Sequence, residues 1–399
     1  MIQKDINQIT EEDLQRLVDN AVVEGKTIEY KQDLPDNSDS NKKEFLADVS
    51  SFANTSGGDL IYGIAEDKGL PLSVEGLNIE NIDQLTQKLD SIIRDGIRPR
   101  IPSITIKPIC LANSKLVLII RILKSWISPH RVEYKKHHKF YSRSSNGKYQ
   151  MDVEELRVSF NLSATIKEKI HLFKLDRISK INADETPIAL NEGAKTVLHL
   201  IPISSFSTLQ QFDIEKIASN PLDIKPICFH YSGSHRYNLE GLLFSAGPSS
   251  YIDSYVQLYR NGVIEAVDGP LLQDGNQKRI ACIAFEGHLI KGVERYVDAL
   301  KKLGVDPPIL IFLTLLNVNE YKLETSYSMS IEDIVSGSYA IDRNILFLPE
   351  VIIENYPFQP ASVLKPCFDA IWQACGKAKC LDYDSEGKWK HTSYLKTIQ

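Results

Sequence analysis

The expected fold rests on two stretches, EGKTIEYK at residues 24–31 and SSFANTSGGDLIYGI at residues 50–64. The first predicts a short strand at 27–31, because hydrophobic and polar side chains alternate there. A period of two places Ile28 and Tyr30 on one face and the charged side chains on the other. One face of this strand therefore packs, while the other stays available for chemistry.

The second stretch predicts a helix followed closely by a strand. Hydrophobic residues recur at helical spacing over 42–54, Gly57-Gly58 ends the helix, and a buried strand follows at 60–64. A glycine pair in this position is typical of a helix end and a tight turn, with Asn54 helping to cap the helix. A nucleotide-binding turn is the alternative, although the stretch does not match the GxxxxGK[ST] phosphate loop.

Outward from these stretches, the sequence predicts two α+β domains joined by a linker. The first has further helices from residue 11, at 83–93 and at 152–160, an antiparallel pair at 104–109 and 116–123, and a strand at 139–143. A connecting helix at 167–181 leads to strands at 197–203 and 309–316, a hairpin within 254–267, and helices at 286–303 and 360–375. We expect domains at 1–162 and 196–399, with the linker at 163–195 and a sensing, dimerisation or partner-binding role for the second domain.

Composition and cysteine placement indicate a globular cytoplasmic protein. Of the 399 residues, 43% are hydrophobic and 25% are charged, which suits packed cores. No apolar run reaches the length of about 18 residues that a membrane helix needs, and the first residues lack a signal-peptide pattern. The six cysteines lie mostly in apolar stretches, so we expect reduced, buried thiols. Cys367, Cys375, Cys380 and His391 could be drawn as a zinc site, but their spacing matches no usual zinc pattern.

Basic residues are concentrated in one part of the first domain. Residues 94–148 contain thirteen Lys or Arg residues and two acidic ones, a local net charge of +11 in a chain whose net charge is -6. Flat rings interleave with the cations, a pattern that suits phosphate neutralisation and base stacking on single-stranded or looped nucleic acid. A solvated, charged hairpin is the alternative. The predicted nucleic-acid-binding residues are Trp126, His130, Arg131, Lys135, Lys136, Lys139, Tyr141 and Arg143.

Three carboxylates of the first domain form a candidate metal site. Glu24 lies at a turn, Glu29 on the first strand, and Asp67 after the second strand. Converging carboxylates are what a hard cation such as Mg²⁺ or Mn²⁺ requires. Such a metal could activate a water for phosphodiester cleavage, while Lys31 could stabilise the developing charge. The alternative is a solvated surface with a weak ion pair.

These motifs resemble the signature of Schlafen AlbA-like domains, E-x-x-x-x-E-[FY]-K followed by F-A-N-x-x-G-G and a hydrophobic strand ending in Gly. The resemblance continues through RIP at 100–102, SWISPHR at 125–131, FYSR at 140–143 and EELR at 154–157, so it covers residues 10–162. It implies a mixed sheet with helices. By similarity to the animal Schlafen ribonucleases, it also implies a metal-dependent RNA-cleaving centre made by Glu24, Glu29 and either Asp67 or the adjacent Glu66.

The function that this resemblance implies is endoribonuclease activity on tRNA or another structured RNA, with Mg²⁺ or Mn²⁺ as cofactor. The implied setting is bacterial antiviral defence or stress response. Those ribonucleases pair two related lobes in one chain, whereas a single signature is present here, so a homodimer could supply the second lobe. Many single-copy bacterial relatives are labelled DNA-binding or ATP-binding, which leaves a non-catalytic DNA- or RNA-binding regulator and a nucleotide-binding sensor as alternatives.

Overall fold

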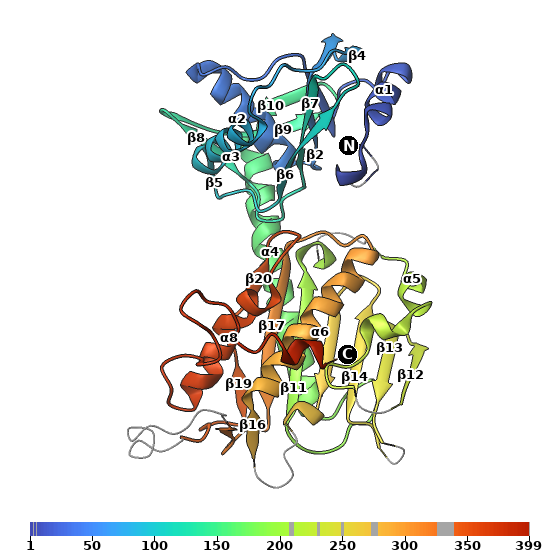
Figure 1. Cartoon of the computed structure of the whole chain (residues 1–399), viewed down its shortest axis with the longest axis vertical. Helices are drawn as coiled ribbons and strands as arrows, with labels where there is room; N and C mark the ends of the chain where they lie inside the picture. Colours follow the sequence, from blue (N-terminus) through green and yellow to red (C-terminus); the bar gives the residue numbers. More distant parts are fainter. Residues whose placement is uncertain are drawn as a thin grey trace. The chain divides into compact units, whose positions relative to one another are not determined.

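Two compact units make up the chain, Met1–Thr165 and Ile166–Gln399. The computed structural model describes residues 1–398 except 3, 5, 207–210, 230–231, 249–250, 273–277 and 325–338. Both units combine helices with sheets (Figure 1), which confirms the expected α+β class. None of the helices in the described residues has the length and apolar character needed to cross a bilayer.

The central sheet of the N-terminal unit has the strand order β1-β2-β7-β6. β1 is parallel to β2, and the other neighbours are antiparallel. Helices α2 and α3 pack on one face of the sheet, and α1 packs on the other together with Ile28 and Tyr30, as the alternation of β1 predicts. The bounds are β1 (Ile28–Lys31), β2 (Gly58–Tyr62), β7 (Leu116–Ile122), β6 (Ile104–Cys110), α1 (Glu11–Asp19), α2 (Asp39–Asn54), α3 (Ile82–Gly96) and the short helix η1 (Ile6–Gln8).

A second sheet of this unit carries the C-terminal part of the basic stretch. Its order is β10-β9-β8-β5, with β5 (Ile97–Arg98), β8 (Arg131–Tyr134), β9 (His137–Ser144) and β10 (Gly147–Gln150). The β8–β9 hairpin turns at Lys135 and Lys136, whose φ angles are 43° and 65°. Both strands of this hairpin contact α2, so the basic hairpin lies against a helix.

The strand expected at 60–64 is not continuous. Gly63 has a φ of 99°, which is open to glycine because it has no Cβ, and the chain leaves the central sheet there. β3 (Ile64–Asp67) then forms a separate hairpin with β4 (Leu70–Val74). The prediction of one strand was therefore wrong at its end, since Ile64 belongs to β3.

The two helices expected at 152–160 and 167–181 are one helix, α4 (Val153–Asn182). The intervening residues 161–166, NLSATI, contain neither glycine nor proline, so nothing in the sequence ends a helix there. The boundary between the two compact units falls within α4, after Thr165.

The C-terminal unit is built on an antiparallel sheet of order β12-β13-β14-β15-β11-β17-β19, with β20 also paired to β17. α6 and α8 pack on one face, and the C-terminal part of α4 packs on the other (Figure 1). The hairpin expected around Gly262 is confirmed as β14–β15.

The bounds of the sheet strands are β11 (Lys195–Pro202), β12 (Gly233–Tyr237), β13 (Gly241–Ala246), β14 (Ser254–Tyr259), β15 (Ile264–Asp268), β17 (Ile309–Leu316), β19 (Ile345–Phe347) and β20 (Val351–Ile353). The remaining elements are the pair β16 (Arg279–Ala281) and β18 (Lys322–Glu324), helices α5 (Glu215–Ala218), α6 (Cys282–Lys302) and α8 (Pro360–Ala374), and the short helices η2 (Ile203–Phe206), η3 (Pro221–Ile224), η4 (Pro270–Leu272) and η5 (Tyr394–Lys396).

Candidate functional site

Glu24 caps the free edge of β1, which is the end strand of its sheet. The Glu24 Oε1 atom accepts the Tyr30 backbone N–H at 2.7 Å, and the Gly25 N–H donates to the Ile28 carbonyl at 3.0 Å. These contacts satisfy backbone groups that an edge strand would otherwise expose. The carboxylate of Glu24 is thereby fixed beside β1, with its Oε2 atom accepting no hydrogen bond from the described residues.

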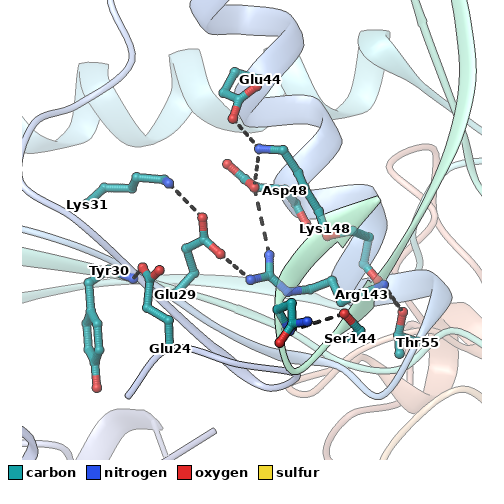
Figure 2. Close-up of polar contacts among 12 residues, drawn as sticks. Glu24, Glu29, Tyr30, Lys31, Glu44, Asp48, Thr55, Arg143, Ser144 and Lys148 are labelled. Atoms are coloured by element: carbon teal, nitrogen blue, oxygen red, sulfur yellow. Dashed lines mark hydrogen bonds and ion pairs between the residues drawn. The ribbon is translucent and has the colours of Figure 1, made fainter. Parts of the chain in front are cut away.

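Glu29 lies in a buried ion-pair network on the other face of β1 (Figure 2). Its Oε1 atom is 2.6 Å from the Lys31 ammonium, and its Oε2 atom pairs with the Arg143 guanidinium. The Arg143 side chain is 0% exposed and stacks over the Phe52 ring at 4.1 Å. The two cations lower the pKa of Glu29 against the opposing effect of burial, which is the largest single influence, so Glu29 is ionised.

A second carboxylate, Asp48 of α2, shares this network. Its Oδ1 atom is 3.8 Å from Arg143 Nη1 and 2.6 Å from Lys148 Nζ, and Lys148 also pairs with Glu44 (Figure 2). Burial raises the pKa of Asp48 to about 6, with Lys148 acting in the opposite direction. Arg143 is thus the internal counter-ion of two buried acids. The prediction that Arg143 contacts nucleic acid was wrong, because a fully buried and paired guanidinium does not reach a phosphate.

His130 is also removed from the predicted binding strip. Its side chain is 0% exposed, its Nδ1 atom lies 2.7 Å from the Pro99 carbonyl, and burial lowers its pKa to about 4. It is therefore neutral and enclosed at pH 7. Asn54 holds this segment in place, since it accepts the His130 N–H at 2.7 Å and donates to the His130 and Tyr141 carbonyls, each at 2.9 Å. Asn54 thus ties α2 to β9 and to the residue before β8. The expected capping role of Asn54 was wrong, because Asn54 is the last residue of α2 and Thr55 occupies the C-cap position.

Of the two candidates for the third acid, Glu66 is the one that hydrogen bonds link to Glu24, through Gly69. Glu66 accepts the Gly69 N–H at 2.6 Å, and the Gly69 carbonyl accepts the Glu24 N–H at 2.7 Å. Burial raises the pKa of Glu24, and the charges of Glu29 and Glu66 raise it further, against the Tyr30 N–H and Lys31. Asp67 is exposed at the end of β3, after a bulge between Ala65 and Glu66 that shifts the alternation.

The predicted trio of Glu24, Glu29 and Asp67 is not preassembled as a tight ligand set. In the described part of the chain, the one group of three His, Cys, Asp or Glu ligand atoms within 4.8 Å of one another lies elsewhere, at Glu286, Cys380 and Asp382. The metal-binding role of the trio therefore stays a prediction.

Several cations of the basic stretch are neutralised within the unit. Lys135 pairs with Asp39 at 2.7 Å and Arg121 pairs with Asp59 at 2.8 Å, and neither acid is counted in the +11. Arg131 pairs at 2.8 Å with Glu133, which that count already includes. Lys124 lies over the half-buried Trp126 ring at 4.2 Å. The local charge of +11 therefore overstates what a ligand meets at the surface.

We use the name hairpin basic surface for the basic side chains at the turn of the β8–β9 hairpin and on the adjacent start of α2, namely Lys43, Lys136, His137, His138 and Lys139. Lys136 and Lys139 are exposed, and no acidic group among the described residues pairs with either. Burial, and then the charges of Lys139, Lys43 and His138, lower the pKa of His137, which shows that these groups lie close together. Tyr141 stacks on His137 with an interplanar angle of 12° and hydrogen bonds to its Nε2 atom. Sequence reasoning missed Lys43, which comes from α2; its only signal is the Lys42-Lys43 pair in the first turns of that helix.

Comparison with known proteins places the likeness on the N-terminal unit. Residues 24–152 match the family model described as Schlafen, AlbA_2. No curated protein matches the sequence. Among solved structures, the N-terminal domain of a RecG-related protein from Nitrosomonas europaea is 24% identical, with 28% of this chain and 70% of that chain covered and a TM-score of 0.21. The DIP2311 protein from Corynebacterium diphtheriae is 18% identical, with 35% and 27% covered and a TM-score of 0.23. At these TM-scores neither structure supports an inference about function.

Proposed function

We propose that the region matching the Schlafen, AlbA_2 family model, residues 24–152, is a metal-dependent endoribonuclease that acts on tRNA or another structured RNA. The observation that carries the proposal is the place of Glu24 at the edge of β1, where burial raises its pKa and the charges of Glu29 and Glu66 raise it further. Mutual repulsion among carboxylates is relieved by a divalent cation, so such clusters point to metal sites and catalysis.

The residues present fit Mg²⁺ or Mn²⁺ in their donor chemistry. The Oε2 atom of Glu24 is available to a metal. Each carboxylate oxygen of Glu29 already has one cationic partner, Lys31 or Arg143, but keeps a second lone pair with which it can also ligate a metal. Glu66 or Asp67 of β3 would complete the set. The bound metal would supply an activated water and neutralise charge on the phosphodiester.

The protein's own groups position this chemistry. Arg143 and Lys31 fix the Glu29 carboxylate from two sides, so its orientation is set before a ligand arrives. Lys31, whose side chain is 34% exposed, is the cation that can approach a phosphate oxygen at this edge and stabilise its negative charge. The Tyr30 N–H holds Glu24 in the same way.

The proposal is tested by incubating the full chain with a tRNA pool in Mn²⁺, in Mg²⁺ and in EDTA, with single-stranded DNA as a parallel substrate. We expect fragments from the RNA with either metal and none in EDTA. If the protein shifts the RNA in a gel but leaves it intact with both metals, it is a non-catalytic nucleic-acid-binding regulator. Cleavage of the DNA alone would contradict the RNA assignment.

We propose that the hairpin basic surface grips the RNA backbone. Lys136→Glu with Lys139→Glu should weaken RNA binding by at least about tenfold and lower the salt dependence by about two ion equivalents, because each lysine that contacts a phosphate releases about one counterion. Filter binding across a salt series measures both quantities. Lys88→Glu with Lys115→Glu makes the same change in net charge elsewhere on the unit; equal losses in the two double variants would place the interface elsewhere.

A further inference from the structure

The C-terminal unit contains a compact cluster of potential metal ligands that the proposed function does not use. Glu286 comes from α6, and Cys380 and Asp382 come from the loop after α8. Their ligand atoms lie within 4.8 Å of one another, and the three residues are 2%, 1% and 1% exposed. Glu286 is far in the sequence from the other two residues, so no spacing motif predicts the cluster.

Three neutral groups donate hydrogen bonds to the buried carboxylate of Glu286. Its Oε1 atom accepts the Trp372 indole N–H and the Cys380 thiol, each at 3.1 Å, and its Oε2 atom accepts the Trp389 indole N–H at 2.7 Å. None of these three donors carries a positive charge. Burying a carboxylate without a compensating cation is costly. A metal ion held by Glu286, the adjacent Cys380 thiol and the Asp382 carboxylate would supply that cation.

The second carboxylate is held by a histidine. His391 Nε2 is 2.6 Å from Asp382 Oδ1, and the His391 side chain is 24% exposed, which gives the cluster one edge near solvent. The loop itself is anchored to α8, because the Cys380 N–H donates to Asp369 Oδ1 at 2.8 Å. Cys282 lies one turn before Glu286 on α6 and so shares its helix face.

We propose that Glu286, Cys380 and Asp382 bind a zinc ion, with His391 orienting Asp382. A thiolate, two carboxylates and a neighbouring imidazole are the mixture of soft and hard groups that suits Zn²⁺ better than Mg²⁺ or Ca²⁺. In a tetrahedral site with bonds of about 2.0–2.3 Å, ligand atoms lie about 3.3–3.8 Å apart, so those at the 4.8 Å limit would move closer by about 1–1.5 Å on binding. On binding, the Cys380 thiol loses its proton to solvent, and the metal replaces the S–H···O contact to Glu286.

The test measures the zinc content of the full chain by plasma mass spectrometry. The protein is purified without metal-affinity chromatography, saturated with Zn²⁺ and dialysed before the measurement. We expect about one zinc per chain in the wild type and a loss of zinc in Cys380→Ser. Because that variant alters a buried group, His391→Gln at the more exposed edge provides a milder second variant, which should weaken zinc affinity about 10–100-fold. Cys367→Ser is the matched control, since its thiol is buried in the same unit but donates to the Pro349 carbonyl; it should keep its zinc.

A chelator should lower the melting temperature of the wild type and of Cys367→Ser while leaving Cys380→Ser unchanged, because a bound metal stabilises only the folded state. A wild-type protein without zinc, or a Cys380→Ser protein that binds it as tightly as the wild type, would overturn the proposal. Another divalent metal bound with the same dependence on Cys380 would overturn the assignment to zinc. None of these measurements involves RNA, so they are independent of the nuclease.

Discussion

Arg143→Met should lower the free energy of unfolding of the N-terminal unit by about 3–5 kcal/mol. The substitution keeps an unbranched side chain over the Phe52 ring but removes the charge that pairs with Glu29 and lies near Asp48. Glu29 and Asp48, which are 7% and 1% exposed, would then have less positive charge near them. The cost arises from the unpaired carboxylates and not from lost packing, which methionine largely retains.

Hydrogen exchange measured by mass spectrometry reports the stability of each unit separately. A single melting curve of a two-unit chain does not separate them. Peptides from α2 and β9 should exchange about two to four orders of magnitude faster, given tenfold per 1.4 kcal/mol. Lys135→Met is the control, because its pair with Asp39 is exposed and screened by solvent, so its loss should leave the exchange rates nearly unchanged.

A second variant separates charge from packing in this prediction. Adding Glu29→Gln and Asp48→Asn to Arg143→Met should recover part of the lost stability, because no buried charge is then left unpaired. If Arg143→Met costs no more than Lys135→Met, the guanidinium is not the internal counter-ion that the network implies.

Sequence patterns predicted the elements that depend on short-range signals, within a few neighbouring residues. The alternation of β1, the helix ending before Gly57-Gly58, and the antiparallel pair β6–β7 all follow from short-range periodicity and turn chemistry, and the structure confirms them. The break after β2 was missed because Gly63 lies inside a hydrophobic run, 60–64, that resembles one continuous strand.

The roles of the charged side chains could not be predicted in the same way. Arg131 and Arg143 stand in the same basic stretch, yet one is half-exposed and the other fully buried. What distinguishes them is Glu29, which is 114 positions from Arg143 in sequence. Partners that meet only through tertiary packing leave no local signal, and this also explains why Lys43 was missed and why Glu66 competes with Asp67.

Glu24→Gln should slow RNA cleavage by about 100-fold or more while leaving the fold and RNA binding intact. The amide oxygen of glutamine can still accept the Tyr30 N–H that Glu24 accepts at 2.7 Å, so the edge of β1 stays capped. The substitution removes the negative charge that a divalent cation would need. Glu29→Gln is a poorer test, because it also disturbs the buried pair with Arg143.

Glu80→Gln provides the matched control for Glu24→Gln, since Glu80 is an exposed carboxylate of the same unit and is not among the charges that act on Glu24. Its cleavage rate should equal that of the wild type. Identical purification of the three proteins guards against a contaminating ribonuclease, which would give all three the same rate.

The most direct test of the proposed nuclease is a single-turnover rate in Mn²⁺, measured with tRNA fully bound by excess protein for the wild type, Glu24→Gln and Glu80→Gln. We predict metal-dependent cleavage by the wild type and Glu80→Gln, with a rate about 100-fold lower for Glu24→Gln at equal RNA occupancy. Equal rates for all three proteins, or intact RNA in every reaction, would contradict a catalytic centre at the edge of β1.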